Sequence, residues 1–147
     1  MQPKESRPVA LQIEAEEYIN FSDSDPTNNG GEYKQDAVDI QSTNDIGGGY
    51  NIGWTENGEW LEYDAYLQSG TYQIIARVSS APGGGAFDIS VDGQFSGSAS
   101  VDTTGGWQSW ENRNLGSVFI PVSGQSTIRV NISSGQFNLN WLRLVPQ

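Results

Sequence analysis

The chain has 147 residues, with 7 Lys and Arg against 18 Asp and Glu, and it contains neither histidine nor cysteine. The formal net charge of −11 argues against nucleic acid as a partner, because phosphate binding needs clustered Lys and Arg. The missing residue types exclude a Ser-His-Asp triad, a histidine general base, a thiol nucleophile, a disulfide, and zinc or iron–sulfur sites built on His or Cys. An apolar content of 35% plus 18 glycines is ordinary for one globular domain.

The first residues differ in composition from the rest of the chain. Residues 1–8 are polar, include two prolines and lack the apolar core of a signal peptide. We expect them to be a linker, with Met1 as an added start residue, and we expect one folded module over residues 9–147. The chain has no run of about 18 apolar residues, so no membrane partner is expected.

Short segments of alternating polar and apolar residues recur along the chain, each bounded by Gly, Ser, Asn or Asp. In the first of them, Leu11, Ile13 and Ala15 fall on one face of a strand. Glu14 and Glu16 fall on the opposite face. Strands are expected, in chain order, over 9–18, 37–41, 50–55, 59–67, 71–79, 87–91, 107–110, 117–122, 127–133 and 137–145.

The segments between these strands carry turn signals. Asp92-Gly93 has the composition of a two-residue hairpin turn, and Glu56-Asn57-Gly58 joins two expected strands. The polar stretch over 22–35 is expected to be a loop, and a second polar stretch follows Asp92-Gly93 and reaches Gly105-Gly106. No window of about 11 residues or more has the period of a helix. Many short strands without helices indicate an all-β fold, an antiparallel β-sandwich with jelly-roll topology.

Two tryptophans lie beside glycine-rich turns, Trp54 directly after Gly53 and Trp107 directly after Gly105-Gly106. Glycine lets the backbone turn sharply and leaves a neighbouring ring uncovered. An exposed flat ring is a platform for the apolar face of a sugar. Asn138, at the start of the last strand, could supply an amide that both donates and accepts hydrogen bonds with sugar hydroxyls. These features make Trp54, Trp107 and Asn138 candidate sugar-binding residues.

A core position is the simpler alternative for a tryptophan, since this residue is highly buried on average. Trp60 and Trp141 lie inside alternating strands and are expected in the core. Tyr33, in the long polar loop, is a candidate third wall of a sugar site, or else a cap on the core.

Glu14 and Glu16 lie two residues apart in the first expected strand, so their carboxylates project from one face about 7 Å apart. The pair could be the two carboxylates of a glycosidase, although residues i and i+2 of one strand form one patch and not two walls around a bond. It could instead hold Ca²⁺, which takes oxygen ligands, with Asn140 adding an amide oxygen. A third interpretation is a solvated strand face.

A further set of aspartates lies in the first third of the chain. Their spacing does not fit an EF-hand loop, so we interpret them as turn and loop residues that add solubility. They are Asp23, Asp25, Asp36, Asp39 and Asp45.

Five segments, taken in order, resemble carbohydrate-binding module family 6 over about residues 10–147. The resemblance depends on all five occurring in the right order. It implies a non-catalytic β-sandwich, a jelly roll, appended to a secreted polysaccharide hydrolase. The segments are Ile13-Glu14-Ala15-Glu16-Glu17-Tyr18, Gly48-Gly49-Tyr50-Asn51-Ile52-Gly53-Trp54, Asn57-Gly58-Glu59-Trp60-Leu61-Glu62-Tyr63, Thr104-Gly105-Gly106-Trp107-Gln108-Ser109-Trp110 and Phe137-Asn138-Leu139-Asn140-Trp141.

The resemblance also implies where a sugar and a metal would bind. The family's main site lies in the loops at one end of the sandwich, and its two rings and its asparagine fall by motif on Trp54, Trp107 and Asn138. A structural Ca²⁺ would be held by the two carboxylates of the Glu-x-Glu motif, Glu14 and Glu16. Its third side-chain ligand, two residues after the binding asparagine, falls on Asn140, where many members carry Asp.

The loop over 28–34 is longer than in xylan-binding members and looks more like modules attached to agarases. Glu32, Tyr33 and Lys34 could then meet the sugar. The ligand expected first is an agar-type galactan, bound at a chain end because a clasp around one ring favours it. Xylan or β-glucan is the alternative.

Three functions from different classes are open at this point. The first is a monomeric, extracellular binding module that holds an attached glycoside hydrolase, such as a β-agarase, near its polysaccharide. The second is a small glycosidase that uses Glu14 and Glu16. The third is a cell-surface adhesion sandwich without a sugar ligand.

Overall fold

The computed structural model describes residues 9–23, 30–31 and 38–147, and these residues form strands and turns without a helix. No helix in this part of the chain is therefore long and apolar enough to cross a membrane. The strands are β1 (Leu11–Glu14), β2 (Asn20–Ser22), β3 (Ile40–Ser42), β4 (Tyr50–Ile52), β5 (Trp60–Leu67), β6 (Gly70–Ser80), β7 (Gly85–Val91), β8 (Gln94–Val101), β9 (Gly106–Ile120), β10 (Gly124–Ser134) and β11 (Asn138–Pro146).

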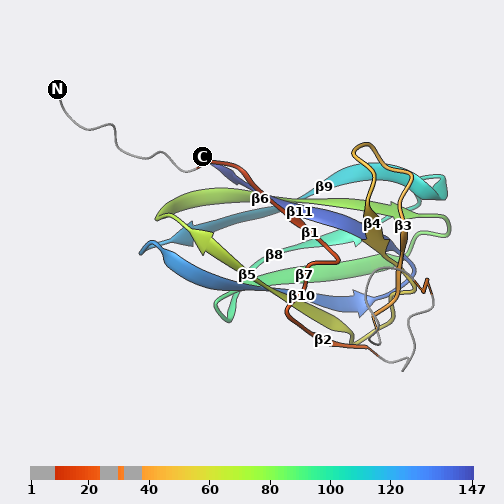
Figure 1. Cartoon of the computed structure of the whole chain (residues 1–147), viewed down its shortest axis with the longest axis horizontal. Coiled ribbons are helices and arrows are strands. Elements are labelled where there is room, and N and C mark those ends of the chain that lie inside the picture. The colour runs from red at the N-terminus through yellow and green to blue at the C-terminus, as the bar shows by residue number, and fades with distance from the viewer. Residues whose placement is uncertain (1–8, 24–29, 32–37) are drawn as a thin grey trace.

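The strands form two sheets that stack as layers, one containing β6, β11 and β1 and the other containing β5 and β10 (Figure 1). The first sheet has the order β3-β4-β11-β6-β9, with β1 paired to β11, and the second has the order β2-β5-β10-β7-β8. The strand pairs are antiparallel. The expected antiparallel β-sandwich is confirmed.

The core between the sheets follows the alternation of the sequence. On β6, Tyr72, Ile74, Ala76 and Val78 are buried, as the period of two predicts for one face of a strand. Tyr63 on β5 is fully buried and its hydroxyl donates to the backbone oxygen of Ala15 at 2.7 Å. Each large apolar side chain buried here contributes about 1.5–3 kcal/mol. This core fixes the sheets on which the connecting loops are mounted.

The hairpin turn and its outgoing strand differ in how well the sequence predicted them. Asp92 and Gly93 both have positive φ, 52° and 81°, as a two-residue hairpin loop requires, and Val91 pairs with Gln94. The polar segment after this turn is the edge strand β8, which was not among the expected strands. An edge strand with Ser and Gly on both faces shows no alternation, and only the turn before it indicated a partner strand.

Strand β9 is one strand of 15 residues where two short ones were expected. It lies at the edge of its sheet and pairs with β6. The middle of β9, from Glu111 to Asn114, is polar and solvated, because an edge strand buries little of either face. That polarity was wrongly interpreted as a break.

Trp60 lies on an outer sheet face, so its placement in the core was wrong. Trp60 is half-buried under the guanidinium of Arg129, which lies 4.1 Å from the ring centroid. Trp141 is buried, as expected, and Arg143 lies over its ring at the same distance of 4.1 Å. In β11 the register against β6 shifts between Leu139 and Trp141, which makes Asn140 the extra residue of a bulge.

Candidate functional site

A cleft of about 450 Å³ opens at one end of the sandwich. It is formed by the segment that enters β5, the start of β9 and the turn that enters β11. Backbone hydrogen bonds tie these segments together, for example from Gln136 N to Thr55 O at 3.3 Å. The lining residues are Gln41, Trp54, Thr55, Glu56, Trp107, Gln136, Phe137 and Asn138.

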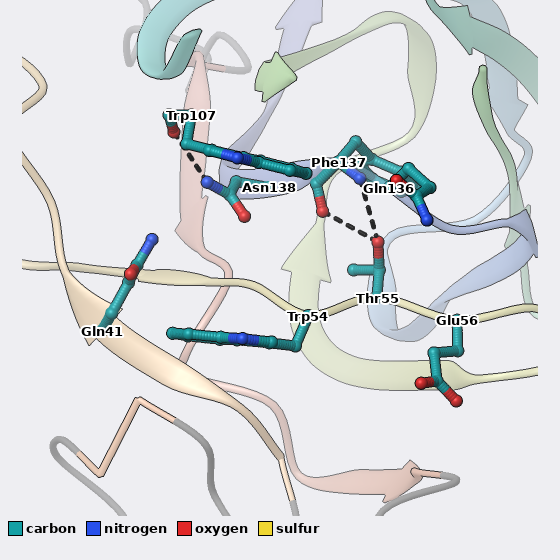
Figure 2. A pocket seen from close by; sticks show the side chains of 8 residues that line it. All are labelled: Gln41, Trp54, Thr55, Glu56, Trp107, Gln136, Phe137 and Asn138. Atoms are coloured by element: carbon teal, nitrogen blue, oxygen red, sulfur yellow. Dashed lines mark hydrogen bonds between the residues drawn. The ribbon is translucent and has the colours of Figure 1, made fainter. Parts of the chain in front are cut away.

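Two indoles form opposite walls of the cleft. Trp54 is 48% exposed and Trp107 is 45% exposed, which is unusual for rings of this size. Figure 2 shows the two rings facing one another across open space, with Asn138 between them and Gln41 on the same side of the cleft as Asn138. The arrangement offers two flat apolar faces to a ligand in water.

Trp54 owes its position to a backbone conformation that tryptophan rarely adopts, with φ at 49°. The flanking residues hold it there. Gly53 N donates to Asp39 O at 2.9 Å, and the hydroxyl of Thr55 donates to Phe137 O at 2.8 Å. A residue kept in such a conformation by its neighbours is a feature that clusters at binding sites.

Asn138 is 3% exposed and supplies the polar group of the cleft. Its Nδ2 donates to the backbone oxygen of Trp107 at 2.7 Å, an oxygen that also accepts from the Ser79 hydroxyl at 2.6 Å. Within the described part of the chain its Oδ1 accepts no hydrogen bond, and it points into the space between the rings (Figure 2). Gly53 makes this possible, since a Cβ there would lie 3.0 Å from that oxygen.

The structure thus brings Trp54, Trp107 and Asn138 to one cleft. Sequence reasoning missed five other lining residues, and all but Phe137 carry polar side chains. Gln136 has a φ of 75°, and nothing in its surroundings in the sequence indicated that. Glu32, Tyr33 and Lys34, the expected additional sugar contacts, lie outside the described residues.

Glu14 and Glu16 do not line the cleft, so the structure gives no support to a glycosidase that uses them on a sugar held there. Among the described lining residues the acidic side chain is that of Glu56, whose backbone N–H donates to Glu59 Oε1 at 2.8 Å. A glycosidase needs two carboxyl groups on either side of the scissile bond. The cleft has the features of a binding site.

The predicted metal ligands lie where β1 ends beside β11: Glu14 is the last residue of β1, Glu16 lies in the turn after it, and Asn140 is the bulge residue of β11. The strand expected over 9–18 therefore ends before Glu16. Glu16 is 5% exposed and Asn140 is 2% exposed, and both Glu16 Oε1 and Asn140 Oδ1 are buried without a hydrogen-bond partner. The backbone hydrogen bond from Ala15 N to Asn140 O, 2.9 Å long, places Asn140 beside the Glu-x-Glu segment. Glu14 is partly exposed and accepts from Gln12 at 3.0 Å.

One carboxyl group of this cluster, that of Glu16, has a pKa well above its usual value. Burial raises the pKa of Glu16 to about 7, and the nearby charges of Glu14 and Glu17 add to the effect. Among the described residues no three acidic side chains converge as metal ligands. A cation at this place would therefore need Asn140 and backbone oxygens in addition to the two carboxylates.

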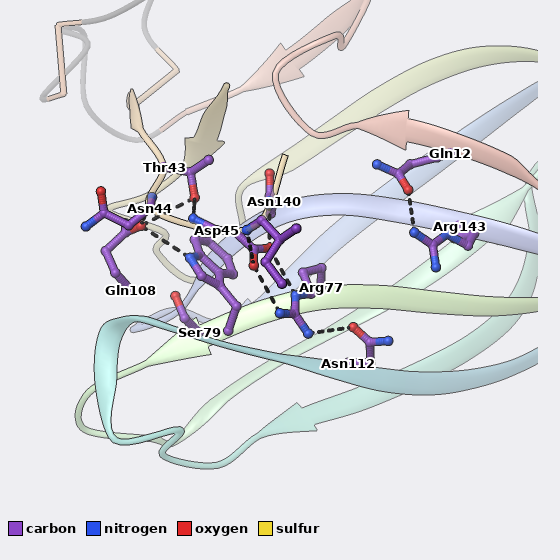
Figure 3. Close-up of polar contacts among 12 residues, drawn as sticks. Gln12, Thr43, Asn44, Asp45, Arg77, Ser79, Gln108, Asn112, Asn140 and Arg143 are labelled. Atoms are coloured by element: carbon purple, nitrogen blue, oxygen red, sulfur yellow. Dashed lines mark hydrogen bonds and ion pairs between the residues drawn. The ribbon is translucent and has the colours of Figure 1, made fainter. Parts of the chain in front are cut away.

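Asp45, which the sequence assigned to turn chemistry, is a buried member of the same region. It forms a two-point ion pair with Arg77, Nε to Oδ2 and Nη2 to Oδ1, both at 3.0 Å. It also accepts from Asn140 Nδ2 at 2.7 Å, and Figure 3 shows Arg77 and Asn140 both turned toward it. Burial alone would raise the pKa of Asp45, but the hydrogen bonds from Arg77 and Asn140 hold it below its usual range.

A second hollow, of about 320 Å³, lies on the outer face of the five-stranded sheet beside Glu62, Arg129 and Asn131. Its polar side chains bond one another. Arg129 Nε donates to Asn131 Oδ1 at 2.8 Å, Asn131 Nδ2 donates to Asp88 Oδ1 at 2.9 Å, and Arg129 Nη1 lies 3.6 Å from Glu62 Oε2. The same arginine covers the ring of Trp60.

A β-sandwich whose loop end carries two uncovered indoles around an open amide oxygen has the architecture of a carbohydrate-binding module. The sequence model described as "Carbohydrate binding module (family 6)" matches residues 31–146, and the chain belongs to this family. The resemblance noted in the sequence is thereby confirmed. The family consists of binding modules and not of catalysts.

Two curated relatives are much longer than this chain. The clotting factor G alpha subunit of Tachypleus tridentatus is 27% identical over 143 residues, which are 95% of this chain and 19% of the relative. The alpha-agarase of Alteromonas agarilytica is 31% identical over 123 residues, which are 80% of this chain and 8% of the enzyme. The chain thus spans less than a fifth of either relative.

Solved structures agree with the fold over almost the whole chain. The family 6 module from Cellvibrio mixtus lichenase 5A, solved with cellotriose, has a TM-score of 0.74 and 29% identity, and the match covers 93% of this chain and 97% of that module. The C-terminal family 6 module of LamC, a marine laminarinase from Zobellia galactanivorans, has a TM-score of 0.72 and 32% identity, with coverage of 92% and 98%.

Proposed function

We propose that the cleft binds one pyranose of a polysaccharide between the indoles of Trp54 and Trp107, with a sugar hydroxyl donating to Asn138 Oδ1. The observation that carries the proposal is the pair of rings, each nearly half exposed, that face one another in a cleft with a volume of about 450 Å³. An exposed ring keeps its apolar face available to the axial C–H groups of a sugar. The amide oxygen, which has no partner among the described residues, gives the site an acceptor at a fixed point.

We take an agar-type galactan, bound at a chain end, as the first ligand. The likeness to an alpha-agarase supports this choice. The second candidate is a β-glucan, which the lichenase and laminarinase modules favour, followed by xylan. The rings accept any pyranose with an apolar face, so hydroxyl geometry around Asn138 and Gln41 decides between these sugars.

The binding would hold an attached glycoside hydrolase, such as a β-agarase, close to its polysaccharide outside the cell. Two rings and a few hydrogen bonds give weak affinity, with a Kd from about tens of micromolar to millimolar, or roughly −4 to −6 kcal/mol. Weak binding by each module suffices for this task, because tethering raises the local concentration of the enzyme.

Affinity electrophoresis tests the proposal. The chain is run through polyacrylamide gels that contain agar, carrageenan, xylan, laminarin or soluble cellulose derivatives, with the Trp107→Ala variant in the neighbouring lane. Retardation by agar above the other polymers, absent in the variant, is the expected result. Retardation by laminarin or xylan instead would transfer the proposal to that sugar. Equal mobility in every gel would favour the adhesion sandwich without a sugar ligand.

We also propose that Glu14, Glu16 and Asn140 hold a structural Ca²⁺. The residues fit this ion, because carboxylate and amide oxygens are its usual ligands and because Glu16 Oε1 and Asn140 Oδ1 are buried without partners. The ion would neutralise carboxylates that burial otherwise disfavours. EDTA should lower the melting temperature and leave the sugar Kd nearly unchanged, as measured by differential scanning fluorimetry and calorimetry. A loss of sugar binding before any loss of stability would contradict a purely structural role.

A further inference from the structure

The amide of Asn140 is oriented by a buried carboxylate. An asparagine amide fits its site with the oxygen or the nitrogen on either side, and the neighbouring groups decide which. Here the neighbour is Asp45 Oδ2, 2.7 Å from Asn140 Nδ2. An ionised carboxylate only accepts hydrogen bonds, so it requires the NH₂ group of Asn140 on its side.

Asp45 is held firmly enough to impose this choice. Both of its oxygens accept from Arg77 at 3.0 Å, and Oδ1 also accepts from the backbone N–H of Ile46 at 2.9 Å. Arg77 in turn donates from Nη1 to Asn112 Oδ1 at 3.0 Å. The ion pair keeps Asp45 charged and leaves it no freedom to rotate away from Asn140.

The other end of the Asn140 amide, its Oδ1, has no hydrogen-bond partner in the described part of the protein. Asn140 Oδ1 is buried without a hydrogen bond, and Glu16 Oε1 is in the same condition. Just beyond the pairing of β1 with β11, Ala15 N donates to Asn140 O at 2.9 Å, and Glu16 follows Ala15 directly. Buried acceptors without partners are unfavourable unless something else satisfies them, and a cation bound by both oxygens would do so.

We propose that Asp45 is a positioning residue for the cation site: the carboxylate, fixed by Arg77, accepts a hydrogen bond from Asn140 Nδ2 and thereby turns the Asn140 oxygen toward the ion. This inference rests on the calcium part of the proposed function. It assigns to Asp45 and Arg77 an effect on Ca²⁺ affinity although neither is itself a ligand. Loss of the orienting carboxylate leaves the amide free to present its NH₂ group to the ion.

Calcium affinity of the EDTA-treated and desalted chain, measured by isothermal titration calorimetry, tests the proposal. The Asp45→Asn variant should bind Ca²⁺ at least tenfold more weakly than the wild type. The matched control is Asp64→Asn, which makes the same chemical change at an exposed position of β5 and should stay within twofold. Melting temperatures with EDTA and with Ca²⁺ are recorded for each protein, and the stabilisation by Ca²⁺ should shrink in Asp45→Asn.

A double variant provides a rescue. In Asp45→Asn/Asn140→Asp the side chain at position 140 has an oxygen on both sides and needs no orienting partner, while the amide at position 45 donates to it. Ca²⁺ affinity should return to within threefold of the wild type or exceed it. This variant also carries the test if Asp45→Asn does not fold.

Two results would overturn the inference. One is an Asp45→Asn variant whose Ca²⁺ affinity equals that of the wild type while its melting temperature falls equally with EDTA and with Ca²⁺, as a merely structural role predicts. The other is a folded double variant that binds Ca²⁺ no better than Asp45→Asn. A wild type that binds no Ca²⁺ would overturn it together with the calcium proposal, whereas sugar binding is judged separately by the gel retardation of the wild type.

Discussion

Two surfaces in the described part of the chain combine tryptophan with an amide and a carboxylate, and they differ in whether the ring faces are open. In the loop-end cleft, Trp54 and Trp107 are each nearly half exposed and Asn138 keeps a free acceptor. On the outer face of the second sheet, Arg129 covers Trp60 at 4.1 Å and its Nε bonds Asn131. Residue composition is therefore a poor guide to a sugar site unless the ring face is also uncovered.

The difference comes from the backbone. Arg129 pairs with Glu62 across β5 and β10, and Trp60 lies two residues from Glu62 on the same face, so regular register itself supplies the cation above the ring. Trp54 and Trp107 lie where strands begin or end and where a positive φ or a glycine turns the chain. No regular neighbour covers a ring at such a position.

Truncation of a cleft ring should have the largest effect. Trp107→Ala removes one wall, and we expect a loss of at least ~2 kcal/mol of binding, about 30-fold in Kd, as for a dominant contact at an interface. The melting temperature should change little, because the ring is 45% exposed and lies outside the core. Calorimetry with oligosaccharide and a thermal melt check both values. A stability loss of about 3–5 kcal/mol would show that Trp107 is a core residue instead.

The amide of the cleft should come next. Asn138→Ala removes the free acceptor and also the donor to Trp107 O, so affinity should fall about tenfold, or ~1.4 kcal/mol. The matched control is Asn131→Ala on the sheet face, where the amide bonds Arg129 and Asp88. That control should leave sugar affinity unchanged. Equal losses in the two variants would break the distinction between the two surfaces.

A smaller effect is expected from a methyl group placed against the same amide. In Gly53→Ala the new Cβ would lie 3.0 Å from Asn138 Oδ1, so the amide must shift by a few tenths of an ångström. Affinity should fall about threefold, which is under ~1 kcal/mol. Gly124→Ala is the control, since a Cβ there meets nothing within 4 Å. An unchanged Kd for Gly53→Ala would mean that the position of the Asn138 oxygen does not matter to the sugar.

The sequence predicted the fold class because most central strands alternate. Strands β5, β6, β7 and β10 each bury one face, and their expected bounds lie within a few residues of the observed ones. The edge strands could not be predicted from alternation. In β8 and β9 both faces meet water over much of their length, so the pattern that marks a strand is absent there.

For the site, glycine before tryptophan was the informative signal, because it indicated a ring that the chain does not cover. Trp60 was wrongly expected in the core, since alternation does not tell which face of a strand lies inward once an arginine covers the outer one. The role of Asp45 was invisible for another reason: its partners, Arg77 and Asn140, lie 32 and 95 residues away. Only the folded chain brings them together.

The smallest effect on binding should come from the covered ring. Trp60→Ala removes a half-buried indole and its contact with Arg129, which should lower stability by about 1–2 kcal/mol, or roughly 3–8 °C in melting temperature. Sugar affinity should stay within twofold of the wild type, because Arg129 already occupies the face that a sugar would need. The same titration used for Trp107→Ala measures it. A tenfold loss of affinity in a variant that remains folded would mean that the sheet face binds sugar as well, and that the guanidinium moves aside to let it do so.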